Sequence, residues 1–151
     1  MTTPLPTDQL EGIWELVSWT QKYDDGRELH PFGKDAAGSI SYVDGRVMVL
    51  IAAGDRPQFT TGGQWNAEAT EKAAAYETFL AYSGTYRYDG ESIEHHVETS
   101  LFPNWVGGVQ RRRVEWDGET LRLTTAPLEA GTSEARVAEL AFRRARTHSA
   151  H

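Results

Sequence analysis

Short runs of alternating apolar and polar residues recur along this chain, and turn-forming residues separate them. Alternation with a period of two turns one face of each run inward, which is typical of antiparallel strands in a barrel or sandwich. The Asp-Gly pairs that begin at positions 44, 89 and 117 fall between consecutive runs and predict tight hairpins. The pattern predicts eight strands, at residues 12–20, 39–43, 46–52, 82–88, 92–100, 106–116, 121–125 and 135–144.

One segment departs from this pattern, because Ala, Glu, Lys and Leu predominate between Asn66 and Leu80. Ala69, Ala73, Tyr76 and Leu80 recur there at helical spacing, and Asn66 is a suitable N-cap. We therefore expect one α-helix, between the third and fourth strands.

The strands are expected to form a single antiparallel sheet that closes into a barrel, since closure protects edge strands from aggregation. A chain of 151 residues fits one domain, which we place at residues 10–146. Residues 1–9 contain two prolines and residues 147–151 are mostly polar, so both segments are expected to be flexible ends.

Composition narrows the classes of protein that the chain can represent. The absence of cysteine excludes a disulfide framework and thiolate metal sites. No apolar run approaches the roughly 18 residues that span a bilayer, and the first residues do not resemble a secretory signal, so we expect a cytoplasmic protein without membrane insertion. The formal net charge of −7 makes nucleic acid an unexpected partner.

Several stretches together resemble the bacterial lipocalin-like domain family, and the similarity covers nearly the whole chain. They are LEGIWELVS at 10–18, FGKDAAG at 32–38, AYSGTY at 81–86 and HHVETSLFPNWVG at 95–107, followed by Gln110 and Arg112. The resemblance implies an all-β, eight-stranded lipocalin-like barrel with an internal cavity, without implying one activity. It also implies that Trp14 closes one end of the barrel beneath Arg144, a structural cation–π contact.

The phase of the apolar residues decides which polar side chains face the interior. In the strand 92–100, His95 and Thr99 share a face with Ile93 and Val97, while His96 lies on the other face. Tyr82 and Tyr86 belong to an aromatic row that is also expected to point inward. We leave two interpretations of His95 open: a core histidine bonded to a tyrosine hydroxyl or a backbone carbonyl, and a ligand-binding or catalytic group.

Gln110 and Arg112 share the face of Val114 and Trp116, which places both inside the barrel. An arginine is almost never fully buried without a partner. Arg112 therefore predicts either an internal ion pair, with Glu98 or another acid, or recognition of an anionic ligand group.

The segment 101–105 places large apolar side chains in a turn, where strand packing does not easily bury them. Phe102 and Trp105 either cap the mouth of the barrel or fill a small core beneath the helix. Residues 53–65, with three glycines, are expected to form a mobile loop beside the mouth.

These expected inward-facing residues are consistent with two main functions. In the first, the barrel binds a small, largely apolar molecule with an acidic or carbonyl end, using Arg112, Gln110, Tyr82, Tyr86, His95, Phe102 and Trp105. In the second, a cofactor-free isomerase, dehydratase or cyclase of natural-product biosynthesis acts on a polyketide-like or terpenoid-like substrate. His95, Tyr82 and Tyr86 would then be catalytic, and Arg112 would stabilise negative charge.

A third possibility is a barrel that is filled by its own aromatic side chains and acts through its exterior, for example as a homodimer through a sheet face. Adjacent His95 and His96 point to opposite faces of a strand and cannot share one internal metal ion, so no metal and no cofactor is expected.

Overall fold

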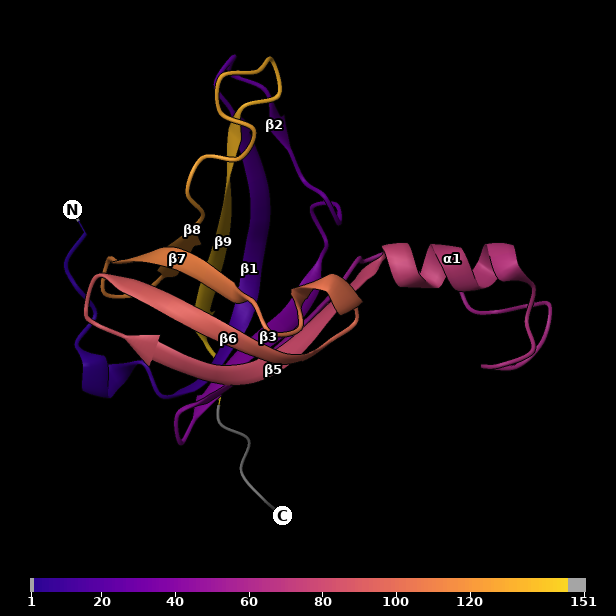
Figure 1. Ribbon diagram of the computed structural model, residues 1–151, viewed down its shortest axis with the longest axis horizontal. Helices are drawn as coiled ribbons and strands as arrows, with labels where there is room; N and C mark the ends of the chain where they lie inside the picture. Colours follow the sequence, from indigo (N-terminus) through magenta and orange to yellow (C-terminus); the bar gives the residue numbers. More distant parts are fainter. Residues whose placement is uncertain (1, 147–151) are drawn as a thin grey trace.

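Antiparallel strands make up most of the protein in the computed structural model, which describes residues 2–146 (Figure 1). Each strand of the barrel pairs with the next barrel strand along the chain, and the first also pairs with the last, which closes the sheet into the predicted eight-stranded barrel. The short strand β2 (Glu28–Leu29) pairs only with the end of β1. The barrel strands are β1 (Gly12–Tyr23), β3 (Ala37–Val43), β4 (Arg46–Ala52), β5 (Phe79–Tyr88), β6 (Ser92–Ser100), β7 (Val109–Trp116), β8 (Leu121–Thr124) and β9 (Arg136–Arg144).

Local sequence explains the hairpin between β3 and β4 and the inward face of β4. Asp44 and Gly45 have φ angles of 49° and 75°, as the two central residues of a type I′ turn require. In β4, Val47, Val49 and Ile51 are buried and the residues between them are exposed. These β-branched side chains fit a half-buried strand, so turn and alternation together define the register.

The helix differs from the prediction in its bounds and its position. Helix α1 (Ala69–Glu77) begins after Glu68, and Leu80 belongs to β5. The expected N-cap Asn66 instead accepts a hydrogen bond from the backbone nitrogen of Gly63, at 2.7 Å. Because β2 is an additional strand too short to predict, α1 follows the fourth strand rather than the third.

Helix α1 and the segment before it extend away from the barrel (Figure 1). No residue of α1 is buried, which explains why its helical spacing of apolar residues does not mark a core face. Within residues 2–146, no helix has the length and apolar character that a membrane span requires.

One end of the barrel is closed by Trp14. Its ring is fully buried, meets the edge of Trp116 at a centroid distance of 5.6 Å, and donates from Nε1 to the carbonyl of Leu10 at 2.9 Å. The guanidinium of Arg144 lies 4.2 Å from the centre of the Trp14 ring and donates to the carbonyl of Gln9. The cation–π contact that the resemblance implies is thus present.

The N-terminal segment was expected to be flexible, but from Thr3 onward it packs against this closed end. Thr3 donates from its backbone nitrogen to the carbonyl of Trp116, and Leu5 and Leu10 are buried. Between them lies a 3-10 helix, η1 (Thr7–Gln9). The apolar Leu5 explains the difference, since burying it offsets the cost of ordering the segment. The expected flexible end at 147–151 lies outside the described residues.

A β-bulge lies between β5 and β6, where the register shifts between Ser83 and Gly84. A Cβ atom built on Gly84 would overlap the carbonyl oxygen of His96, so only glycine allows the two strands to approach this closely. The bulge also reverses the phase of β6 beyond Val97. The expected inward position of Thr99 is therefore wrong: Thr99 is exposed and contacts Ser83 through its hydroxyl.

Candidate functional site

A cavity of about 510 Å³ occupies the barrel beyond the packed end. Its volume lies within the range of small-molecule sites, roughly 300 to 1,000 Å³. The barrel is therefore not filled by its own aromatic side chains. Apolar residues form most of the wall, and they come from the strands, from the 3-10 helix η2 (Pro103–Trp105) and from the loop between β8 and β9. They are Trp19, Ile40, Val49, Ile51, Leu80, Trp105, Leu123, Ala126, Pro127, Leu128, Ala138, Leu140 and Phe142.

His95 lies in the cavity wall between two tyrosines. β6 points its side chain inward with Ile93 and Val97, as the alternation predicts. The hydroxyl of Tyr42 on β3 lies 2.7 Å from His95 Nε2, and that of Tyr82 on β5 lies 2.7 Å from Nδ1. Both ring nitrogens are thus engaged, and the interpretation of His95 as a hydrogen-bonded core histidine agrees with this geometry.

Burial sets the protonation of this group at neutral pH. Desolvation, together with the nearby positive charge of Arg112, lowers the pKa of His95 to about 3. Desolvation likewise raises the pKa of Tyr82 to about 12 and raises that of Tyr42 well above 10. All three side chains are therefore neutral at pH 7, and the imidazole is a weak base.

Arg112 extends into the same cavity from β7 and is partly buried. Its guanidinium donates to the side-chain oxygen of Gln110 at 3.1 Å and to the backbone carbonyl of Arg111 at 2.8 Å. Among residues 2–146 it pairs with no carboxylate, and desolvation lowers the pKa of Arg112. The internal ion pair with Glu98 is wrong, because Glu98 lies outside and pairs with Arg46 at 2.5 Å.

Of the other predicted site residues, some line the cavity and some do not. Trp105 lines the cavity, and its ring meets the edge of Tyr82 at a centroid distance of 5.7 Å. Phe102 is exposed on the outside, where it packs edge-on against Trp105. Tyr86 lies against Tyr42, at a centroid distance of 4.8 Å, and does not line the cavity. None of residues 53–65 lines it either.

Sequence reasoning missed two residues of the site, Tyr42 and Trp19. Tyr42 is fully buried next to His95, and its alternation with Ile40 could have indicated this. Trp19 faces the cavity because the register of β1 shifts between Leu16 and Ser18, which no simple alternation reveals. In the described part of the chain the indole Nε1 of Trp19 is buried without a hydrogen-bond partner.

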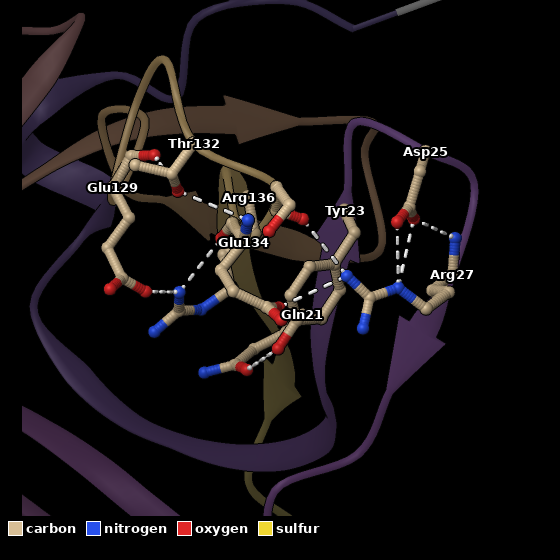
Figure 2. Close-up of polar contacts among 9 residues, drawn as sticks. Gln21, Tyr23, Asp25, Arg27, Glu129, Thr132, Glu134 and Arg136 are labelled. Carbon is tan, nitrogen blue, oxygen red and sulfur yellow. Dashed lines mark hydrogen bonds and ion pairs between the residues drawn. The ribbon is translucent and has the colours of Figure 1, made fainter.

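A polar network surrounds the far end of β1, opposite the Trp14 end (Figure 2). Arg27 pairs with Asp25 at 2.9 Å and with Glu134 at 3.1 Å, and its guanidinium lies 4.2 Å from the centre of the Tyr23 ring. Arg136, the first residue of β9, pairs with Glu129 on the loop that precedes this strand. These contacts attach the loop 125–135, which contributes cavity-lining residues, to β1 and β2.

The described residues were also considered as metal ligands. Within the part of the chain that the structure describes, no three His, Asp or Glu side chains are placed to hold an ion together. The polar side chains that line the cavity are those of Gln21, Tyr82, His95, Gln110, Arg111, Arg112 and Thr125. Both ring nitrogens of His95 are hydrogen-bonded, and the other groups are suited to hydrogen bonding rather than to metal coordination.

A closed antiparallel barrel, plugged at one end by a tryptophan beneath an arginine and hollow beyond it, defines a lipocalin-like barrel protein. Residues 11–145 match the lipocalin-like domain family, and the chain belongs to this family.

A curated relative is similar to part of the chain. It is the 4'-hydroxy-3'-methoxypropiophenone carrier protein ppsC of Aspergillus oryzae, 41% identical over 63 residues. The match includes 36% of this chain and 57% of the relative, so the chain spans little more than half the length of that protein. No solved structure matches the chain.

Proposed function

We propose that the barrel binds a small, largely apolar molecule that carries a carbonyl or acidic group. The observation that carries this proposal is Arg112, a partly buried cation with no carboxylate partner among residues 2–146, in the wall of a cavity of about 510 Å³. Burying a charge without a counter-charge is unfavourable. A ligand oxygen that accepts hydrogen bonds from the guanidinium accounts for an arginine at this place in the cavity wall.

The relative supports an aromatic ketone as the ligand class. Its name describes a carrier of 4'-hydroxy-3'-methoxypropiophenone, which is an aryl ketone with a phenolic hydroxyl. The cavity here has an apolar wall with aromatic side chains from Trp19, Tyr82 and Trp105, which suits an aromatic ring. A carbonyl oxygen on such a ring that points towards Arg112 and Tyr82 would meet hydrogen-bond donors there.

The alternative of acid–base catalysis has less support. A base needs a free nitrogen, but both nitrogens of His95 are hydrogen-bonded and its pKa is near 3. Tyr82, with a pKa near 12, is a weak acid. The proposed role is therefore binding or transport of a ligand that leaves unchanged.

Isothermal titration calorimetry with propiophenone, a phenylalkanoate and a medium-chain fatty acid tests this proposal. We expect at least one acceptor-bearing aromatic compound to bind in a one-to-one complex. Arg112→Met should weaken that binding roughly tenfold or more, as expected for loss of a hydrogen bond from a charged group.

Arg113→Met is the matched control, because Arg113 lies on the outer face of the same strand and pairs with Glu115. It should leave affinity unchanged. If no compound binds and native mass spectrometry of the purified protein shows no retained small molecule, the proposal is wrong.

A further inference from the structure

Two tyrosine hydroxyls flank the ring of His95, and only one of them can donate its proton to that ring. A neutral imidazole has one N–H donor and one acceptor nitrogen. One tyrosine must therefore donate to the acceptor nitrogen while the other accepts from the N–H. The hydroxyl proton of the second tyrosine is then left for another partner.

The surroundings of the two hydroxyls differ. Tyr42 is fully buried and does not line the cavity, and His95 Nε2 is the one hydrogen-bond partner of its hydroxyl among residues 2–146. Tyr82 lines the cavity, where water or a ligand can accept its proton. Leaving the Tyr42 proton buried without an acceptor would be disfavoured roughly tenfold or more.

The favoured arrangement therefore has one direction. Tyr42 donates to Nε2 of His95, the Nδ1–H of His95 donates to the oxygen of Tyr82, and the Tyr82 proton faces the cavity. The low pKa of His95 agrees with this arrangement, because the ring keeps a single proton at pH 7.

We propose that Tyr42 and His95 fix Tyr82 as a hydrogen-bond donor to the ligand, so that the cavity selects molecules whose buried polar group is an acceptor oxygen, such as a ketone carbonyl. This inference rests on the proposed binding function and extends it to the kind of group that is recognised. Tyr82 contacts the ligand, and His95 is a positioning residue in its Nδ1–H tautomer.

Other polar side chains of the cavity point to the same ligand chemistry. Arg112 has donors only, and the Gln110 atom that faces it must be the acceptor oxygen, which leaves the Gln110 amide nitrogen as a further donor. Each of these groups is complemented by a ligand that accepts hydrogen bonds.

The first test reads the tautomer of His95 in the unliganded protein. A long-range ¹H–¹⁵N NMR spectrum of the histidine-labelled protein distinguishes a protonated ring nitrogen from a bare one, and the His95→Gln variant assigns the signals. We expect the proton on Nδ1 at pH 7. A proton on Nε2, or comparable amounts of both tautomers, would overturn the inference whether or not a ligand binds.

The second test compares propiophenone with propylbenzene, which has a similar shape but no oxygen. The wild-type protein should prefer propiophenone, because propylbenzene leaves the Tyr82 proton without an acceptor. Tyr82→Phe should weaken propiophenone binding roughly three- to tenfold and should tighten propylbenzene binding or leave it unchanged, because the unpaired hydroxyl is then absent. Tyr42→Phe leaves the Tyr82 hydroxyl in place but removes the donor to Nε2 of His95, so it should reduce the preference, because Nδ1 can then accept the Tyr82 proton. An undiminished preference in Tyr42→Phe would show that Tyr42 does not fix the direction of the Tyr82 hydroxyl.

The outcomes separate the two proposals, once the ¹H–¹⁵N spectrum of each variant shows that it is folded. Undiminished preference for propiophenone in Tyr82→Phe would overturn the donor role of Tyr82 while leaving the binding function intact. Failure of both compounds to bind would overturn the selection of a ketone carbonyl. The binding function would then be decided separately by calorimetry with the two acids and by native mass spectrometry, and the tautomer measurement would still decide the arrangement around His95.

Discussion

Arg112 occupies a position in the cavity wall that costs stability, and the ligand contact proposed above would offset that cost. Arg112 is a partly buried cation whose partners are the neutral oxygens of Gln110 and Arg111. Hydrogen bonds to neutral oxygens replace its hydration incompletely, so the folded protein carries a desolvation cost at this position. A ligand oxygen that accepts from Arg112 reduces this cost.

We expect Arg112→Met to have opposite effects on stability and on affinity. The variant should melt at the wild-type temperature or a few degrees above it, because Met fills the position without a charge. Differential scanning calorimetry of the unliganded protein measures this, with Arg113→Met as the control on the outer face. A large drop in melting temperature would show that Arg112 stabilises the fold.

His95 makes the stability of the protein depend on pH. Its pKa is about 3 in the folded protein and about 6.5 in an unfolded chain, so between these values the unfolded state binds the extra proton. The stabilising effect of the neutral histidine is fully present above pH 6.5 and decreases as the pH falls. The decrease is about 1.4 kcal/mol for each pH unit until the folded-state pKa is reached.

Urea denaturation at pH 6.5 and pH 5 measures this dependence in a range where most carboxylates stay ionised. The wild-type protein should lose about 2 kcal/mol of unfolding free energy more than His95→Gln loses between the two values. Equal losses in the two proteins would show that His95 is not the group responsible.

Alternation along a strand predicted the inward position of His95 and Arg112. His95 in β6 and Arg112 in β7 follow directly from the apolar residues two positions away on the same strand. Trp19 could not be found in this way, because the shift between Leu16 and Ser18 changes which positions of β1 face inward. The partner of Arg112 was also unpredictable, since pairing across strands depends on register rather than on local sequence.

At the scale of the elements, the β5–β6 bulge determines which part of β6 faces the cavity. On one side of it His95 and Val97 point inward, and on the other side Thr99 is exposed. Glycine at position 84 permits this arrangement, because the backbone of β6 at His96 occupies the space of a side chain. Eight strands and a barrel were predictable from alternation and turns. The bulge was not predictable, because a glycine in a strand can mark a bulge, a bend or the close approach of another backbone.

We expect Gly84→Ala to destabilise the protein by about 3 kcal/mol, since the new methyl group forces the β5 and β6 backbones apart. Urea denaturation measures the loss. Gly63→Ala is the control, because a Cβ atom there meets its nearest neighbour, the side-chain oxygen of Asn66, at an ordinary 3.4 Å. A loss below 1 kcal/mol for Gly84→Ala would mean that the strands can adjust.

At the scale of the whole molecule, the protein divides into a closed end, a hollow middle and an external excursion. The excursion, residues 54–77, leaves the barrel between β4 and β5 and returns to the same place (Figure 1). Several of its side-chain contacts are internal: Glu71 accepts hydrogen bonds from Thr60 and Thr61, and Lys72 donates to the carbonyl of Trp65. The excursion therefore contributes little to the barrel core.

The two strands that flank this excursion are already joined, because the backbone nitrogen of Ala53 donates to the carbonyl of Thr78 at 3.0 Å and Ala52 pairs with Phe79. Replacing residues 54–77 with a short Asn-Gly turn should therefore convert β4 and β5 into a simple hairpin. The barrel should still unfold cooperatively, with a melting temperature within about 4 °C of the wild type.

Propiophenone binding is the second readout of this deletion, because none of the removed residues lines the cavity. Affinity within a factor of about two of the wild-type value is expected, since a change of that size is well below the contribution of one hydrogen bond. A folded deletion variant that has lost binding would instead assign the excursion a direct role in holding the ligand, and would move the functional boundary of the site beyond the barrel wall.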